Sequence, residues 1–509
     1  MPRFPGVLLG SALGLFCFAV APSAAAVPTA ATLDRMDKTI EERMGPNGAP
    51  GFAVAVVAGD RIAHARGFGS ANDGDRRVTP DTPFLLASAS KSFTALAVMQ
   101  LVDAGKVKLD APVRRYVPEF RLAGSAADRI TVRHVLQHTS GLPGNAAGGP
   151  ILKSATDGTP MEAIAELRGK PPASRPGTEM EYVNANYVLA GLVVERASGE
   201  PYGRYVERHI FAPLRMSNSF TAPGPARRAG LAAGHRYVFG FADRTGPTHR
   251  SGVLAAGYLM ASARDMGRYL AMYLNHGVGP GGRRVVSEQG LRTLLAPGKP
   301  DTELGGWADG AKSHYAMGWF VGGPWKQPAV LHPGDAADSS SLMVLLPRRG
   351  MAVVTLVNAS NELAVPGNPF AISRMQRNAV DVLLGAPVDT GTSIHRFYFF
   401  VDLVLALLAI AAATGLVRAL LSVRRARPPR HRRRAIAAVP LRVVLAALVL
   451  GYPSLIGGWT ATLYWFPDLG LAAAGIAAAI LAAAVLRFTW LLRTRPRRAH
   501  PPPRERVMA

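Results

Sequence analysis

Thiol chemistry is nearly absent from this 509-residue chain, because Cys17 is its only cysteine. Cys17 lies inside an apolar run that follows Arg3 and precedes the small residues Ala24 to Ala26. That order is typical of a secretory signal peptide, which we predict over residues 1–26, with an uncleaved anchor helix as the alternative. Cleavage would remove the only thiol and would exclude disulfides, thiolate metal sites and a cysteine nucleophile from the mature chain.

Acidic residues and lysines are also scarce. The 34 Asp and Glu face 58 Lys and Arg, which gives a formal net charge of +24, and only nine of these basic residues are lysines. The excess of arginine is concentrated near the C-terminus, and no basic helix with interleaved aromatic residues occurs outside the long apolar segments. Nucleic-acid binding is therefore not expected.

Three apolar runs near the C-terminus are each long enough to cross about 30 Å of hydrocarbon. They are Phe397–Leu421, roughly Val443–Trp465, and Leu469–Leu492. Arginine-rich segments follow the first and third runs, whereas the link between the second and third contains Asp468 and no arginine. The positive-inside rule places both arginine-rich segments in the cytoplasm and everything before the first run outside the cytoplasmic membrane.

These signals divide the chain into parts. We predict an extracytoplasmic domain over 31–388, a linker over 389–396, three transmembrane helices with a basic cytoplasmic loop over 397–492, and a basic cytoplasmic tail over 493–509.

The predicted domain has strand signals at both ends and helical signals between them. Apolar runs on either side of Gly59-Asp60 predict one β-hairpin, and runs around Pro347 to Gly350 predict another. The segment SKSFTALAVMQLVDAG has a helical pattern that ends at Gly105. We therefore predict an α+β fold in which an antiparallel sheet from both chain ends packs against a helical portion.

The segment ASASKSF places Ser88 three residues before Lys91, where a long apolar helix is predicted to begin. Residues three apart share a helix face, so the amine would lie near the hydroxyl. A helix N-terminus also favours an oxyanion. The alternative is that Ser88 caps the helix and Lys91 is solvated, and the spacing alone does not decide between the two.

Two more polar groups stand beside apolar segments. Tyr182 and Asn184 come directly before a predicted helix, and His332-Pro333-Gly334 comes just ahead of a predicted strand. With these segments, and others in the same order, the sequence resembles the serine β-lactamase and penicillin-binding-protein superfamily, closest to its class C and DD-peptidase-like branch. The similarity covers nearly all of the predicted domain, and the three apolar runs lie outside it.

The resemblance implies a catalytic set. Ser88 would be the nucleophile that forms an acyl-enzyme, Lys91 would keep it activated, and Tyr182 would shuttle the proton. No cofactor and no metal ion are implied.

The resemblance also implies a substrate cleft. Asn184 would hold the substrate's amide beside His332, and Gly334 would let the edge strand approach closely. The backbone N–H groups of Ser88 and Asp335 would form the oxyanion hole, in which one donor is typically worth about 3 to 4 kcal/mol.

The sequence departs from the family pattern at one motif. His332-Pro333-Gly334 stands where the class C enzymes and many peptidases carry Lys-Thr-Gly, so a group with a pKa of about 6.5 replaces a permanent cation. Recognition of a substrate carboxylate should be weaker, which leaves D-amino-acid peptides and esters open beside β-lactams. Asp338 stands where the family tends to have glycine, so the shape of that loop is left open.

Other constellations are less favoured. His134 and His138 could ligate a metal ion from one helix face, but no third ligand stands nearby. Ser140 has no lysine or acid at a useful spacing and is interpreted as a turn residue. No G-x-S-x-G motif occurs, which argues against an α/β-hydrolase.

The sequence therefore predicts a membrane-tethered serine hydrolase that acts through Ser88 on an amide, β-lactam or ester outside the cytoplasmic membrane. D-amino-acid peptides or β-lactam-like molecules are the expected substrates, peptidoglycan fragments among them, and the oligomeric state is undetermined. The alternatives are a non-catalytic sensor that binds cell-wall peptide or penicillin, and an esterase.

Overall fold

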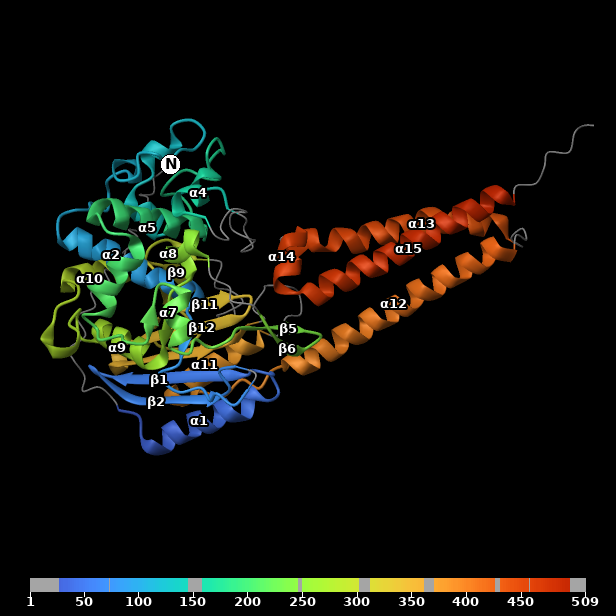
Figure 1. Ribbon diagram of the computed structural model, residues 1–509. Coiled ribbons are helices and arrows are strands. Elements are labelled where there is room, and N and C mark those ends of the chain that lie inside the picture. Colours follow the sequence, from blue (N-terminus) through green and yellow to red (C-terminus); the bar gives the residue numbers. More distant parts are fainter. Residues whose placement is uncertain are drawn as a thin grey trace, which may run out of the picture.

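The computed structural model describes most of the chain after the N-terminal segment. The described ranges are 27–72, 74–144, 158–245, 250–301, 312–360, 370–425, 431–456 and 458–494. The predicted signal peptide and nearly all of the predicted cytoplasmic tail lie outside these ranges. A mixed αβ domain occupies one end of the molecule, and long C-terminal helices extend from it (Figure 1).

An antiparallel sheet forms the base of the αβ domain. Within the described residues its strands lie in the order β2 (Arg61–Gly69), β1 (Gly51–Ala58), β13 (Met351–Val357), β12 (Ser339–Leu346), β11 (Val330–Ala336), β10 (Phe320–Gly322), β9 (Ser313–Tyr315) and β8 (Pro300–Asp301). β1 pairs with β13, with Val54 opposite Thr355. The α+β fold with a sheet built from both chain ends is confirmed.

Both predicted hairpins are present. β1 and β2 are joined at Gly59, where φ is +63°, and β12 and β13 are joined by a turn that ends at Gly350, where φ is +57°. Glycine adopts this left-handed region without the steric cost of a Cβ. The local turn signals in the sequence were therefore sufficient to place these four strands.

Helices cover both faces of the sheet (Figure 1). α1 (Ala30–Met44) and α11 (Ala371–Leu384) pack together on one face, and α9 (Ala263–Leu274) packs on β1 and β13 from the other. The other described helices of the domain are α2 (Ser90–Asp103), α3 (Val132–Leu136), α4 (Pro160–Ala165), α5 (Asn184–Ser198), α6 (Tyr202–Val206), α7 (Pro223–Arg228), α8 (Leu254–Gly257) and α10 (Glu288–Leu295). α2 ends just before Gly105, as the sequence predicted.

Two small sheets complete the domain. One contains β3 (Pro83–Leu85), β7 (Met260–Ser262) and β4 (Ser219–Phe220). The other contains β14 (Ala359–Ser360), β5 (His235–Val238) and β6 (Phe241–Arg244). β5 and β6 form a hairpin that reaches toward the first C-terminal helix (Figure 1).

The C-terminal part contains α12 (Ile394–Arg425), α13 (Arg432–Gly451), α14 (Gly458–Trp465) and α15 (Pro467–Arg493). Three helical stretches are long and apolar enough to cross a membrane, namely Ile394–Arg425, Arg432–Ser454 and Pro467–Arg493. The expected bounds of the second span were wrong, because the helix begins earlier and ends near Pro453. α13 ends at Gly451, a 3₁₀ segment over Tyr452–Ile456 follows, and Gly458–Trp465 form a separate short helix that begins at a glycine with φ +88°.

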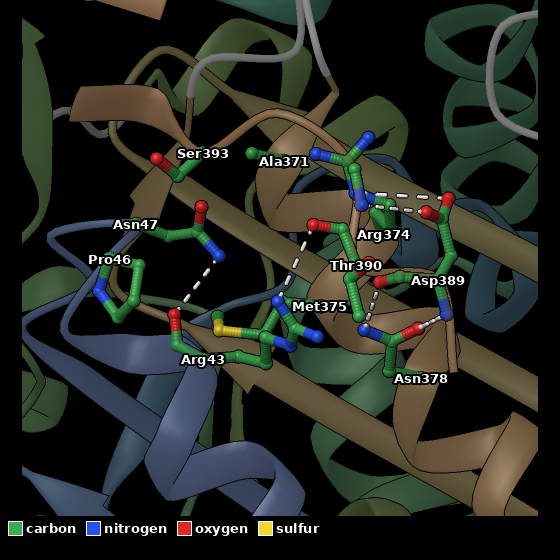
Figure 2. A pocket seen from close by; sticks show the side chains of 11 residues that line it. Arg43, Pro46, Asn47, Ala371, Arg374, Met375, Asn378, Asp389, Thr390 and Ser393 are labelled. Carbon is green, nitrogen blue, oxygen red and sulfur yellow. Dashed lines mark hydrogen bonds and ion pairs between the residues drawn. The ribbon is translucent and has the colours of Figure 1, made fainter. Parts of the chain in front are cut away.

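The segment before α12, which the sequence suggested as a linker, is hydrogen-bonded to the αβ domain (Figure 2). The Asn378 side chain donates to the Asp389 carbonyl at 3.0 Å and accepts the Asp389 N–H at 3.1 Å. The Ile394 N–H donates to Asn47 Oδ1 at 3.4 Å, and Ile394 and Tyr398 are buried. The first C-terminal helix is therefore held against the domain from its first turn.

Candidate functional site

Ser88 lies in a single 3₁₀ turn, Ala87–Ala89, directly before α2. Its Oγ is 3.0 Å from Lys91 Nζ, one helical turn further on. Ala87 has φ +46°, a left-handed conformation that is strained for a residue with a side chain, and such strain collects at functional sites. The turn thus holds a partly exposed hydroxyl beside a buried amine.

Lys91 has no exposed surface, so the alternative of a solvated lysine is wrong. The Ser88 side chain also makes no capping hydrogen bond to the turn or to α2. Lys91 Nζ donates to the Ala256 carbonyl at 2.6 Å and forms no ion pair with any acid that the structure describes. Burial therefore lowers the pKa of Lys91 well below its ordinary value.

Tyr182 lies against the same amine. Lys91 Nζ is 4.8 Å from the centroid of the Tyr182 ring, which is partly buried. The ring stacks on His138 at 4.3 Å and lies parallel to Phe320 at 6.3 Å. Tyr315 meets it edge-on at 5.9 Å. Aromatic groups from three separate segments thus restrain the orientation of this phenol.

A buried polar cluster that sequence reasoning missed lies beneath Tyr182. Ser140 Oγ donates to Asn186 Oδ1 at 2.6 Å. His138 Nδ1 accepts the Val183 N–H at 3.1 Å and is 3.0 Å from Asn186 Nδ2. Burial, followed by the nearby Lys91 charge, lowers the pKa of His138 well below its ordinary value, so the ring is neutral and can accept.

Ser140 is also the turn residue that the sequence indicates, because its Oγ accepts the Leu142 N–H at 3.2 Å. The alternative of a metal site at His134 and His138 is not supported. His138 lies beyond the end of α3 with φ +55°, so it does not share a helix face with His134. In the described part of the chain no three His, Cys, Asp or Glu side chains are grouped to hold a metal ion. Asn186, a polar residue at the start of the otherwise apolar NYVLAGLVV run, is the sequence signal that could have indicated a polar cluster here.

Asn184 is the first residue of α5 and is partly exposed. Its side chain makes no hydrogen bond to any residue within the described ranges. The amide is therefore available at the same end of α5 as Tyr182, which stands two residues earlier in the chain.

His332, Pro333 and Gly334 lie inside β11, directly ahead of the expected strand, β12. β11 is also an inner strand, although β10 pairs only with its first two residues. A Cβ on Gly334 would lie 2.2 Å from the Leu86 carbonyl oxygen and 2.9 Å from the Ala89 nitrogen. Glycine therefore allows the backbone of β11 to touch the turn that carries Ser88. The next residue, Asp335, accepts a hydrogen bond from Ser340 at 2.8 Å.

His332 faces the site but is only 1% exposed. Its Nδ1 lies 2.6 Å from the Pro333 carbonyl, to which it donates, and its Nε2 lies 3.3 Å from the Tyr315 hydroxyl. Burial, with a smaller effect from the Lys91 charge, lowers the pKa of His332 to about 3. The expectation of a group titrating near pH 6.5 is wrong, because water is excluded from this layer of the site.

The structure defines the shape of the loop that contains Asp338, which the sequence did not predict. Asp338 lies in the tight turn between β11 and β12 and is buried. Its Oδ2 accepts from Thr245 Oγ1 at 2.7 Å, and its carbonyl accepts the His235 N–H at 3.0 Å. The β11–β12 turn is thereby joined to the β5–β6 hairpin.

Acid is expected to destabilise the αβ domain through His332. A histidine whose pKa is about 3 when folded and about 6.5 when unfolded contributes stability that is complete above pH 6.5 and is lost as the pH falls toward 3. Between pH 6.5 and pH 5 the loss is about 2 kcal/mol for this one group. His138, whose pKa is also lowered by burial, should further reduce the stability of the folded domain in acid.

The measurement is the thermal unfolding midpoint of the full chain in detergent at about pH 7.5 and pH 5, compared with His332→Gln. The midpoint of the variant should fall less between the two conditions. An equal fall in both proteins would mean that His332 is not kept neutral by the fold.

The chain is similar to known proteins in sequence and in structure. The Beta-lactamase family matches residues 36–373. Protein flp from Staphylococcus aureus (strain N315) is 25% identical over 332 residues, covering 64% of this chain and 63% of that protein. Penicillin-binding protein 4 from Amycolatopsis lactamdurans is 31% identical over 325 residues, covering 61% and 81%. The chain thus spans less than two thirds of the length of the Staphylococcus protein.

Among solved structures, the octameric penicillin-binding protein homologue from Pyrococcus abyssi matches with a TM-score of 0.60 and 26% identity. The match covers 70% of this chain and 78% of that one.

Proposed function

This chain belongs to the Beta-lactamase family, as its residues indicated, and from that premise we propose that it is a serine hydrolase that works through a Ser88 acyl-enzyme. The observation that carries the proposal is the buried amine of Lys91, 3.0 Å from the Ser88 hydroxyl oxygen. A buried lysine without an acid partner is costly to the fold, and catalysis gives a physical reason to keep it.

The chemistry follows from the lowered pKa of Lys91. A neutral amine has a lone pair that can accept the Ser88 proton as the oxygen attacks a carbonyl carbon. Tyr182, whose ring lies beside the same amine, would pass a proton to the leaving group. The N–H groups of Ser88 and Asp335 would stabilise the oxyanion, and water would then release the acyl group.

The substrate is proposed to be an amide, β-lactam or ester, with D-amino-acid peptides or β-lactam-like molecules preferred. Asn184 would bind the substrate's amide. Because burial keeps His332 neutral, no fixed positive charge stands at that position to bind a carboxylate. We therefore expect a smaller dependence on a substrate carboxylate than a lysine there would give.

We also propose that the domain is tethered at the outer face of the cytoplasmic membrane. Three helices have the length and composition for spans, and the arginine-rich segments after Leu421 and after Leu492 support a cytoplasmic C-terminus.

The second proposal for the domain is a sensor that binds cell-wall peptide or penicillin without turnover. It would keep the cleft but would not need Ser88, Lys91 and Tyr182 together, which favours the enzyme.

A fluorescent penicillin and an acyl-phosphonate probe test the proposal on the full chain. Covalent labelling should occur and should disappear in Ser88→Ala. The matched control is Ser92→Ala, in the first turn of α2, where the hydroxyl donates to the Ala89 carbonyl at 2.8 Å. That variant should label normally. A folded chain that neither probe labels would favour the sensor, and a panel of peptide, β-lactam and ester substrates would separate the remaining choices.

A further inference from the structure

The β5–β6 hairpin ends in an unusual turn. Val238 pairs with Phe241, so Phe239 and Gly240 form a two-residue loop. Both have positive φ, +48° and +78°. Such loops prefer Asn-Gly, and a bulky aromatic residue in the left-handed region is strained. Phe239 is therefore an exposed aromatic residue in a backbone conformation that is unfavourable for it.

Both aromatic side chains at the tip are exposed, Phe239 by 47% and Phe241 by 72%. Outside the C-terminal helices, the only other large apolar side chain with such exposure in the described part of the chain is Val27. Two phenylalanines are thus gathered at one protruding turn, although the other large apolar side chains that the structure describes between residues 30 and 388 are at least partly covered.

Two of the C-terminal spans contact this turn at their starting ends. A Cβ on Gly240 would lie 2.7 Å from the Cβ of Tyr398, near the first turn of the apolar part of α12. The Phe239 N–H donates to Asp468 Oδ2 at 2.6 Å, at the first turn of α15. The tip is therefore level with the point at which both spans begin (Figure 1).

We propose that the Phe239 and Phe241 side chains lie in the interfacial region of the phospholipid bilayer that the spans cross. This inference rests on the proposed membrane tethering. Apolar and aromatic side chains are stabilised at the boundary between headgroups and acyl chains, which explains two exposed phenylalanines at the end of the spans. The contact is continuous with the lipid-facing surface of α12, where Phe399 and Phe400 are also exposed.

The position of the β5–β6 hairpin would affect how far the proposed substrate cleft lies from the membrane. The hairpin is bonded to the β11–β12 turn through Thr245 and Asp338, and β11 carries the proposed oxyanion-hole residue Asp335. A hairpin seated in lipid would hold the cleft at a set height above the membrane.

Spin labels on the full chain in phospholipid nanodiscs test this inference. Cys17 is the only native cysteine, so Cys17→Ala provides a background for single-cysteine variants. Phe241→Cys is the test site. Gln289→Cys, at an exposed position of α10 away from the spans, is the aqueous control, and Leu407→Cys, 58% exposed in α12, is the hydrocarbon control.

Each label is then probed with oxygen, which partitions into lipid, and with a nickel chelate, which stays in water. The oxygen-to-nickel accessibility ratio at Phe241 should be several-fold above that at Gln289 and below that at Leu407. A ratio equal to that at Gln289 overturns the inference, and so does protection from both reagents, which would mean that protein covers the tip. An aqueous result at Leu407 would instead show that the tethering itself is wrong.

Discussion

Lys91→Met is expected to form the acyl-enzyme about 10²- to 10⁴-fold more slowly than the unaltered chain, which is the usual contribution of a positioned general base. Methionine fills a similar volume but cannot accept the Ser88 proton. The same variant should unfold at a higher temperature, because an unfolded lysine is protonated at pH 7 while the buried amine is held toward its neutral form. Activity and stability should thus change in opposite directions.

The measurements are the rate of covalent labelling by a fluorescent penicillin or acyl-phosphonate and the thermal unfolding midpoint in detergent. Lys106→Met is the matched control, since Lys106 is exposed just beyond the end of α2. Neither its labelling rate nor its midpoint should change. Rapid labelling of Lys91→Met would mean that another group accepts the Ser88 proton, and a lower midpoint would mean that the buried amine stabilises the fold.

Gly334→Ala should slow acylation by about 10²- to 10³-fold, as the loss of one oxyanion-hole donor does. The added methyl group would lie 2.2 Å from the Leu86 carbonyl oxygen and 2.9 Å from the Ala89 nitrogen. Both atoms are backbone, so β11 must move away from the turn that carries Ser88. The N–H of Asp335 would move with it and would no longer converge with the N–H of Ser88.

Gly257→Ala is the control for this variant, because Gly257 contacts the same turn. There the added Cβ would lie 3.6 Å from the nearest Ala87 atom, an ordinary van der Waals distance, and acylation should stay close to that of the unaltered chain. The comparison separates a collision from the general effect of adding a methyl group. Equal labelling rates in the two variants would contradict the close approach of β11.

Local features were predictable from the sequence because the responsible interactions lie within a few residues. The turns at Gly59 and Gly350 and the end of α2 near Gly105 each depend on glycine beside a patterned segment. The sequence allowed either a contact between Ser88 and Lys91 or a capping Ser88 with a solvated Lys91. A three-residue helical spacing brings the two side chains together but does not show whether they are buried.

Features that depend on distant segments could not be predicted. Ser140 and Asn186 are hydrogen-bonded although they are far apart in the chain, and no sequence pattern around either residue indicates the other as its partner. The pKa of His332 is set by burial under Tyr315 and Phe320 and by the Lys91 charge, none of which its neighbours in β11 reveal.

By itself, the sequence determined the family, the α+β architecture, the presence of three long apolar helices and the residues that carry the proposed chemistry. Only the tertiary structure decided that Lys91 is buried without an ion pair to any described acid, that His332 is shielded from water, and that the β5–β6 hairpin contacts the apolar C-terminal helices. The physical reason is that turns and helices follow from neighbours along the chain, whereas desolvation and close backbone approach follow from neighbours in space.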